Sequence, residues 1–340
     1  MASYQLKVVS IRQETNDTFT FALKQPGLKK IKYLPGQYLT IVVNINNRKF
    51  KRPYSFSSAP GIDVNLEITV KRVQNGIVSN HLIDVVKEGD MLEVMPPMGE
   101  FVYDQITHLS KHIQLWGAGS GVTPLMSILK YALSLNTTKV TLNLCNKTKE
   151  ETIFLNQLLV IKNNYPDKFT FNLYCTKESN ADTFTGRITA DTVVELMSGC
   201  EDETIHFICG PLGLKENVKN ALNILNIRED SVYSEDFEHL VNEQDLEGVT
   251  TQMVDVSFGS DSVRVEVVKG KSILEACLDY GLDIPYSCQT GTCHLCKSKL
   301  IAGTVKTIKE EQTETDNLPD GVHLLCCSYP LDDRIILKID

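Results

Sequence analysis

Four cysteines near the end of the chain constrain its fold more than any other feature of the sequence. Cys288, Cys293 and Cys296 fall within nine positions, and Cys326 follows after 29 further residues. Such a set can form disulfides, bind zinc or hold an iron–sulfur cluster. Ten cysteines in 340 residues are too sparse for a disulfide scaffold, and the N-terminus lacks the apolar run of a secretory signal. We therefore expect a cytoplasmic protein in which these thiols bind metal.

Length and charge limit the classes of function. A chain of 340 residues exceeds what one hydrophobic core usually holds, so two or three domains are expected. The net charge of −9 argues against nucleic acid and anionic membranes as partners. No apolar run approaches the roughly 18 residues of a membrane span, so we expect no membrane insertion.

The pattern of apolar residues changes along the chain and predicts a multidomain protein. Short β-type runs separated by turns predict an antiparallel β-barrel over residues 1–107. Alternating strands and helices, one helix covering 150–164, predict an α/β domain with a parallel sheet over 108–236. Six acids between Glu235 and Glu247, without lysine or arginine, predict an acidic linker over 237–250. Strands and one helix then predict a small α+β domain over 251–340.

The cysteine spacing separates the metal alternatives. Structural zinc sites usually use two closely spaced pairs, and only one such pair is present. The arrangement C-x4-C-x2-C…C is typical of plant-type [2Fe–2S] ferredoxins, and Gly291 would let the loop wrap closely around a cluster. Residues 251–340 resemble such a ferredoxin, which implies a β-grasp fold. In that family the last ligand stands four residues before a proline, which selects Cys326, before Pro330, over its neighbour Cys327.

Three stretches in the first hundred residues resemble the flavin site of the ferredoxin–NADP reductase superfamily. "RPYSFSS" (52–58) is by itself compatible with an ordinary strand end, but "ITVKRV" (68–73) and "GIVSNHL" (76–82) follow it in the family's order. The resemblance implies that Arg52 holds a flavin phosphate, Tyr54 packs on the ring and Ser55 bonds at N5. The "GIVSNHL" loop would bind a pyrophosphate at a helix N-terminus, which implies FAD rather than FMN. The implied FAD-binding residues are Arg52, Pro53, Tyr54, Ser55, Thr69, Val70, Lys71, Gly76, Ile77, Val78 and Ser79.

The next stretches resemble the nicotinamide-nucleotide site of the same superfamily. "WGAGSGVTPLMSILK" (116–130) is a glycine-rich turn that opens a helix, although a packing turn is the alternative reading. "FICGP" (207–211) and "YSEDF" (233–237) resemble later signatures, so Ser55, Cys209 and Glu235 would shape the hydride-transfer site and Phe237 would approach the flavin. The implied nucleotide-binding residues are Gly117, Gly119, Gly121, Val122, Thr123, Pro124, Cys209, Gly210 and Pro211.

Two further segments bear on the coenzyme. "LCNKTKEETIFLNQL" (144–158) and "TGRIT" (185–189) resemble the segments that contact the adenosine ribose or a 2′-phosphate. Lys147 and Arg187 would make these contacts, which favours NADPH slightly over NADH. A solvated surface charge is an equally good interpretation of Lys147.

The order of domains, reductase first and ferredoxin last, resembles the reductase components of phenylacetyl-CoA epoxidase-type and related oxygenases. The resemblance implies an NAD(P)H-dependent electron-transfer reductase. Electrons would pass through FAD and a [2Fe–2S] cluster to an acceptor protein such as an oxygenase component. The alternative is a non-catalytic redox-sensing or zinc-binding interaction protein on the same fold.

Overall fold

The structure is a computed structural model that describes residues 3–26, 31–104, 112–135, 139–198, 204–239, 241–259, 261–309 and 318–339. The chain forms two compact units. One comprises Met1–Val43 and Pro53–Asp236, and the other comprises Asn44–Arg52 and Phe237–Asp340. None of the described helices is long and apolar enough to cross a membrane.

The first sheet is antiparallel and has the order β4-β3-β6-β1-β2-β5. Its strands are β1 (Tyr4–Thr15), β2 (Thr18–Lys24), β3 (Tyr38–Ile45), β4 (Arg48–Ser55), β5 (Leu66–Lys71) and β6 (Met91–Val94), and helix α1 spans Ile77–Asp84. Just after β4, Phe56 forms a β-bridge to Ile68 in β5. This bridge joins the two ends of the sheet, as the predicted barrel requires.

The second sheet is parallel and has the order β10-β9-β8-β7-β11-β12. Its strands are β7 (His112–Ala118), β8 (Lys139–Asn146), β9 (Phe169–Cys175), β10 (Phe184–Thr185), β11 (Thr204–Cys209) and β12 (Val232–Glu235). The strand order reverses between β7 and β11, which is where open α/β sheets bind ligands.

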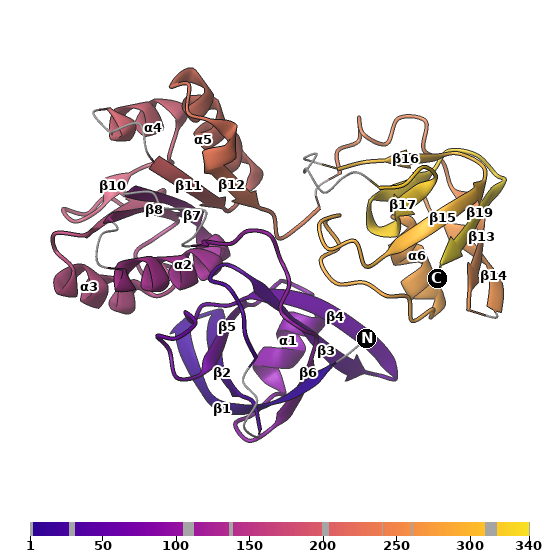
Figure 1. The fold of residues 1–340 in the computed structure, drawn as a ribbon, viewed down its shortest axis with the longest axis horizontal. Helices are drawn as coiled ribbons and strands as arrows, with labels where there is room; N and C mark the ends of the chain where they lie inside the picture. The colour runs from indigo at the N-terminus through magenta and orange to yellow at the C-terminus, as the bar shows by residue number, and fades with distance from the viewer. Residues whose placement is uncertain are drawn as a thin grey trace. The chain divides into compact units, whose positions relative to one another are not determined.

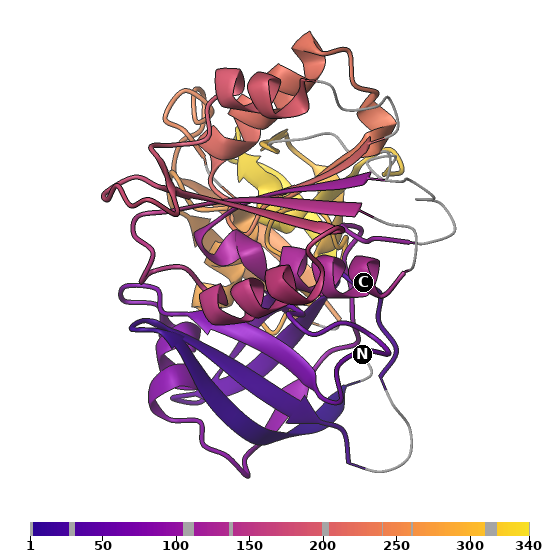
Figure 2. The same cartoon turned by 90° about the vertical axis from the view of Figure 1, so that its left-hand side faces the viewer.

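Helices cover both faces of this parallel sheet (Figures 1 and 2). On one face α2 (Val122–Ser134) and α3 (Leu155–Asn164) form a core that includes Leu115, and on the other α4 (Ala190–Met197) and α5 (Leu212–Ile224) pack around Trp116. The helix expected over 150–164 begins only at Leu155, because Phe154 takes a left-handed conformation (φ 63°).

The second unit contains a mixed five-stranded sheet with the order β14-β13-β19-β15-β17 and a small sheet of β16 and β18. Its elements are β13 (Gln252–Phe258), β14 (Asp261–Val267), α6 (Ile273–Tyr280), β15 (Lys297–Ala302), β16 (Val305–Thr307), β17 (Val322–Leu324), the 3₁₀ turn η4 (Leu325–Cys327), β18 (Ser328–Pro330) and β19 (Ile335–Ile339). A capping box of Ser272 and Glu275 starts α6.

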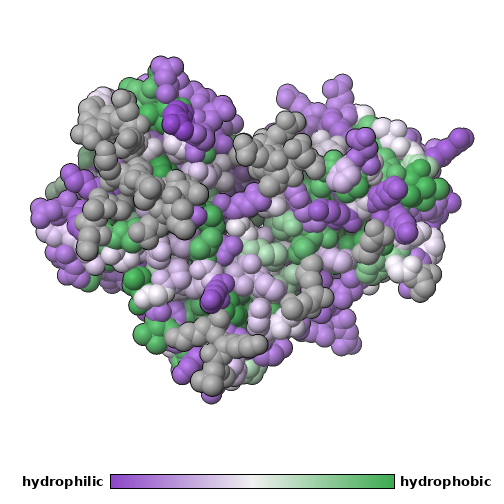
Figure 3. Space-filling view, in the orientation of Figure 1, coloured by the Kyte–Doolittle hydropathy of each residue, from purple (hydrophilic) through white to green (hydrophobic). Residues whose placement is uncertain are grey.

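The end of the predicted acidic linker (237–250) is packed against the second unit rather than exposed to solvent. Val249 is only 1% exposed and lies against Ile308 and Tyr329. Elsewhere the large exposed apolar side chains are scattered, and the face drawn in Figure 3 shows apolar patches among hydrophilic residues.

Candidate functional site

The three residues expected at the hydride-transfer site converge at the carboxyl edge of the parallel sheet. Cys209 ends β11 and Glu235 ends β12, and the two are paired across the strands. The Ser55 hydroxyl, at the end of β4, donates to Glu235 Oε2 at 3.5 Å. Ser55 and Glu235, which are 180 positions apart in the sequence, therefore meet at the end of β12, one strand away from the point where the strand order reverses.

Cys209 is fully enclosed at this edge. Burial raises the pKa of its thiol well above the ordinary value, and the charges of Glu235 and Asp236 act in the same direction. A neutral, buried thiol is a poor nucleophile. This state of the thiol argues against covalent catalysis by Cys209.

An ion pair that the sequence did not reveal holds the end of β12. Lys215, 4% exposed on α5, donates to Asp236 Oδ2 at 2.6 Å. This contact fixes the backbone just beyond Glu235. Phe237 begins the second unit, and its approach to the flavin stays a prediction.

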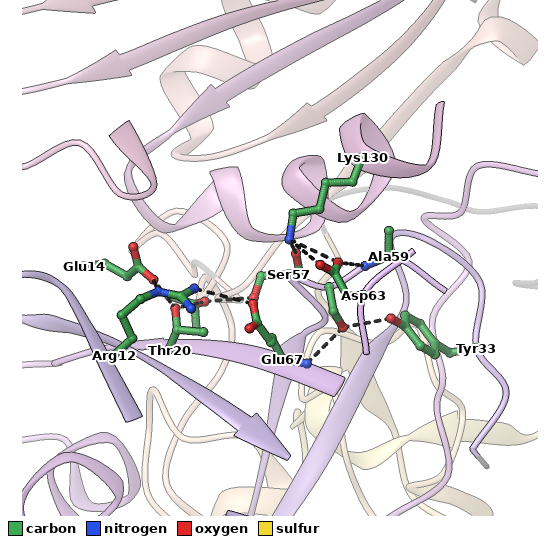
Figure 4. A network of polar contacts seen from close by, with 11 residues as sticks. Arg12, Glu14, Thr20, Tyr33, Ser57, Ala59, Asp63, Glu67 and Lys130 are labelled. Atoms are coloured by element: carbon green, nitrogen blue, oxygen red, sulfur yellow. Dashed lines mark hydrogen bonds and ion pairs between the residues drawn. The ribbon is translucent and has the colours of Figure 1, made fainter. Parts of the chain in front are cut away.

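The end of the flavin motif takes part in a buried polar network (Figure 4). The Ser57 hydroxyl bonds with Thr69 (3.0 Å), and Thr69 bonds with Thr20 (2.8 Å). The Thr69 hydroxyl is therefore engaged inside the barrel, so its backbone is the part left for a flavin. Of the other predicted residues here, Val70 is fully buried, Lys71 lies 3.7 Å from Asp17, and Arg52 donates to the Lys51 carbonyl at 2.8 Å.

Helix α2 is tied directly to this segment. The Ser127 hydroxyl donates to the Ser58 carbonyl at 2.6 Å, and Lys130 Nζ donates to the Ser57 carbonyl at 3.2 Å. Lys130 also pairs with Asp63 at 3.1 Å, and Asp63 accepts from the Ala59 amide at 2.7 Å (Figure 4). The helix that follows the glycine-rich turn is thus anchored to the end of the flavin motif and to the loop beyond it.

The turn before α1 has the geometry of an anion site. Gly76 is the N-cap, and a Cβ there would lie 2.7 Å from Ser79 Oγ and 2.8 Å from Val73 Cβ. No acidic residue occupies the first helical turn, so the amides of Ile77, Val78 and Ser79 begin the helix without a competing carboxylate.

The glycine-rich turn between β7 and α2 is shaped by packing as well as by ligand binding. A Cβ at Gly121 would lie 2.0 Å from the Cys209 carbonyl oxygen, and one at Gly117 would lie 2.8 Å from Leu125. Gly119 alone has a left-handed backbone (φ 53°) with open space around it. The predicted nucleotide residues Val122, Thr123 and Pro124 are buried, so contacts there would come from backbone amides. Gly210 and Pro211 link the buried Cys209 to the start of α5.

Three exposed cations follow three neighbouring strands of the parallel sheet. Lys147 comes after β8, Lys177 after β9 and Arg187 after β10, and the Lys177 amide donates to the Lys147 carbonyl at 2.9 Å. Two of these were predicted. Lys177 was missed, although it follows "FTFNLYC" much as Lys147 follows "TLNLCN".

The cysteines expected to hold a cluster face one another. Cys288 Sγ accepts from the Thr290 amide at 3.4 Å and from the Cys293 amide at 3.3 Å. Hydrogen bonds from the Cys293 and Cys326 thiols hold the pKa of Cys288 far below its usual range, and a bond with Cys326 also lowers the pKa of Cys296. Amides directed at a sulfur, on a loop with Gly291 at φ 85°, fit a cluster that carries negative charge.

The fit of these cysteines to a cluster depends on contacts between pairs of thiols. Among the described residues, no set of three or more His, Cys, Asp or Glu side chains is already arranged to hold a single metal ion. Cys326 contacts the Cys288 and Cys296 thiols, whereas the contact of Cys327 is with Cys326 Sγ, at 3.6 Å. The geometry supports Cys326 as the fourth ligand.

Comparisons with known proteins identify three kinds of domain along the chain. Family models match an oxidoreductase FAD-binding domain over residues 5–103, an oxidoreductase NAD-binding domain over 115–220 and a 2Fe-2S iron-sulfur cluster binding domain over 258–331. They confirm the fold class and the cofactors expected from the sequence. The zinc-binding alternative loses its support.

Relatives match over nearly the whole chain. The ferredoxin reductase component of 3-ketosteroid-9-alpha-monooxygenase from Rhodococcus rhodochrous is 30% identical over 98% of this chain and 96% of its own. A component of 1,2-phenylacetyl-CoA epoxidase from Escherichia coli K12 is 29% identical over 99% of this chain and 98% of its own. The solved structure of phthalate dioxygenase reductase matches with a TM-score of 0.73 at 23% identity, covering 99% of this chain and 98% of that one.

Proposed function

This chain belongs to the FAD- and [2Fe–2S]-containing reductase components of oxygenase systems, which transfer electrons from NAD(P)H to an oxygenase partner, and we propose that three of its residues shape the site where the coenzyme reduces the flavin. These are Ser55, Cys209 and Glu235. The observation that carries the proposal is that Glu235 is paired with Cys209 across two strand ends and also accepts the Ser55 hydroxyl, beside the point where the strand order reverses. When bound, FAD accepts a hydride and releases its electrons singly, and the cluster carries one electron at a time.

Each of the three has a distinct task. Ser55 holds its hydroxyl against Glu235 and so presents a fixed hydrogen-bonding group beside the ring. Glu235 places a negative charge at the carboxyl edge of the parallel sheet. Lys215 fixes the backbone next to Glu235 through its ion pair with Asp236. The buried Cys209 acts through its backbone, because its carbonyl packs on Gly121 and so joins the coenzyme turn to the strand that ends beside Glu235.

Backbone groups bind the phosphates. The amides at the start of α1 suit the FAD pyrophosphate, and those from Gly119 to Thr123 suit the coenzyme pyrophosphate. Cys288, Cys293, Cys296 and Cys326 would hold the cluster. None of the nine described cysteines forms a disulfide, which fits a reducing cytoplasm.

A substitution at Ser55 tests this site. Ser55→Ala should retain FAD but slow flavin bleaching by NADPH in anaerobic stopped flow by about tenfold, because one hydrogen bond to a charged group is lost. Ser134→Ala, at the exposed end of α2, is the control. Flavin reduction at the unaltered rate in Ser55→Ala would contradict the proposed role.

The finer proposal is that NADPH is the preferred coenzyme. Lys147, Lys177 and Arg187 gather positive charge at the carboxyl ends of three adjacent strands, which suits a 2′-phosphate. Lys177→Gln should lower the ratio of kcat/KM for NADPH over NADH by about tenfold, since one charge-assisted hydrogen bond is removed. Lys162→Gln, exposed on α3, should leave the ratio unchanged. A wild-type preference for NADH would refute the coenzyme assignment and leave the electron relay intact.

A further inference from the structure

Cys327 lies against the proposed cluster site although it is not one of the proposed ligands. Its side chain is completely buried, and its Sγ is 3.6 Å from Cys326 Sγ. On another side, a Cβ added at Gly291 would come within 2.8 Å of the same sulfur. The Cys327 thiol therefore contacts both a ligand sulfur and the loop that carries the first three ligands.

Backbone hydrogen bonds hold this thiol in place. The Cys327 carbonyl accepts from the Ile308 amide at 2.9 Å, and the Leu325 amide donates to the Cys296 carbonyl at 3.0 Å. The 3₁₀ turn of residues 325–327 is thus fixed on both sides. Cys326 is turned toward the other ligand thiols, and its neighbour is held one position away from them.

The direction of the hydrogen bond between the two sulfurs follows from ligation. A cysteine that binds iron is a thiolate and has no proton to donate. In the loaded protein, the Cys327 thiol is then the only possible donor in this pair.

We propose that Cys327 is a positioning and tuning residue whose S–H donates to the Cys326 thiolate and raises the reduction potential of the [2Fe–2S] couple. Hydrogen bonds to the sulfurs of a cluster are among the determinants of its potential. Reduction adds one negative charge to the centre, so a donor stabilises the reduced form more than the oxidised form. One electron enters, no bond breaks, and Cys327 keeps its proton.

The inference rests on the proposed function, in particular on Cys326 as a ligand. Its test is nevertheless independent of the coenzyme, because the midpoint potential is measured with dithionite and mediators. Failure of NADPH to reduce the flavin would refute the relay without altering this measurement.

The experiment compares three substitutions at one position in the full-length holoprotein. Cys327→Ala and Cys327→Val remove the donor, and Cys327→Ser keeps one. We expect the first two to lower the equilibrium constant for cluster reduction about tenfold, which is about 59 mV for one electron, and the serine variant to stay near the wild-type potential. Cys277→Ala is the control, because Cys277 is equally buried on α6 and burial alone raises the pKa of its thiol.

The spectrum of the reduced cluster is a second measurement, and a change in packing alone would not alter it. The electron paramagnetic resonance (EPR) signal of the reduced cluster should shift in Cys327→Ala and Cys327→Val, and should stay near wild type in Cys327→Ser and Cys277→Ala. Equal potentials in wild type, Cys327→Ala and Cys327→Val would overturn the proposal. Loss of iron and sulfide in all three Cys327 variants, with retention in Cys326→Ala, would also overturn it, because Cys327 would then be the ligand.

Discussion

Lys130 contacts the end of the flavin motif and the loop that follows it, and Lys130→Met tests this contact by removing the charge while keeping the length of the side chain. Lys130 pairs with Asp63 and donates to the Ser57 carbonyl. Removal of one partner of a buried pair costs about 3–5 kcal/mol, whereas exposed pairs are worth about 1 kcal/mol or less. These side chains are 14% and 27% exposed, so we expect an intermediate loss of about 2 kcal/mol in unfolding free energy.

The substitution should also affect catalysis. The turn proposed to bind the coenzyme opens α2, and Ser57 belongs to the proposed flavin motif, so the lysine would help to set the distance between the two ligands. Misplacement by about 1 Å can cost about a hundredfold in rate. We expect at least a tenfold slower flavin reduction in anaerobic stopped flow, with a fall in Tm of about 4–8 °C for this unit.

A double-mutant cycle separates this contact from general destabilisation. Asp63→Asn leaves Lys130 without its partner, and the double variant Asp63→Asn/Lys130→Met should lose less than the sum of the single losses. Lys162→Met, exposed on α3, is the matched lysine control. If Lys130→Met reduces its flavin at the wild-type rate and unfolds at the wild-type temperature, the reasoning is wrong.

Two other predictions concern the parallel sheet. Burial, reinforced by the charge of a nearby histidine, lowers the pKa of His206 to about 3. Because the unfolded chain takes up this proton near pH 6.5, the contribution of His206 to stability is complete above that pH and falls by about 1.4 kcal/mol per unit as the pH drops toward 3. Trp116 is the single tryptophan and donates to His206, so its fluorescence can follow acid unfolding. The unfolding free energy should fall less steeply with decreasing pH in His206→Gln than in wild type. An equal slope in the two proteins would contradict the assignment. Gly121→Ala should abolish flavin reduction by coenzyme and destabilise the unit by more than about 3 kcal/mol, because the new Cβ meets the Cys209 carbonyl at 2.0 Å. Gly213→Ala, with nothing within 4 Å on α5, should be neutral or slightly stabilising, and equal effects of the two would refute the packing argument.

Features set by local sequence could be predicted. The spacing of Cys288, Cys293 and Cys296 fixes a loop whatever surrounds it, and the alternation of strands and helices after residue 112 fixes a parallel sheet. The grouping of Ser55, Cys209 and Glu235 came instead from the resemblance of their motifs to a known family, and in the structure Ser55 and Cys209 both lie beside Glu235.

Features set by long-range contacts could not be predicted. The tight packing of Gly121 depends on the Cys209 carbonyl, which lies 88 positions away in a neighbouring strand. Lys130 and Lys215 look like ordinary helical lysines until Asp63 and Asp236 are placed beside them. Apolar periodicity also extended α3 too far toward its N-terminus, because it carries no information on the left-handed Phe154.

The relay through sulfur-bound iron is tested most directly by EPR of the anaerobic holoprotein after addition of NADPH. The account predicts about one unpaired spin per chain with the signature of a reduced [2Fe–2S] centre, together with a bleached flavin. A flavin that bleaches while the iron stays oxidised, or a purified protein that lacks iron and acid-labile sulfide, would contradict it.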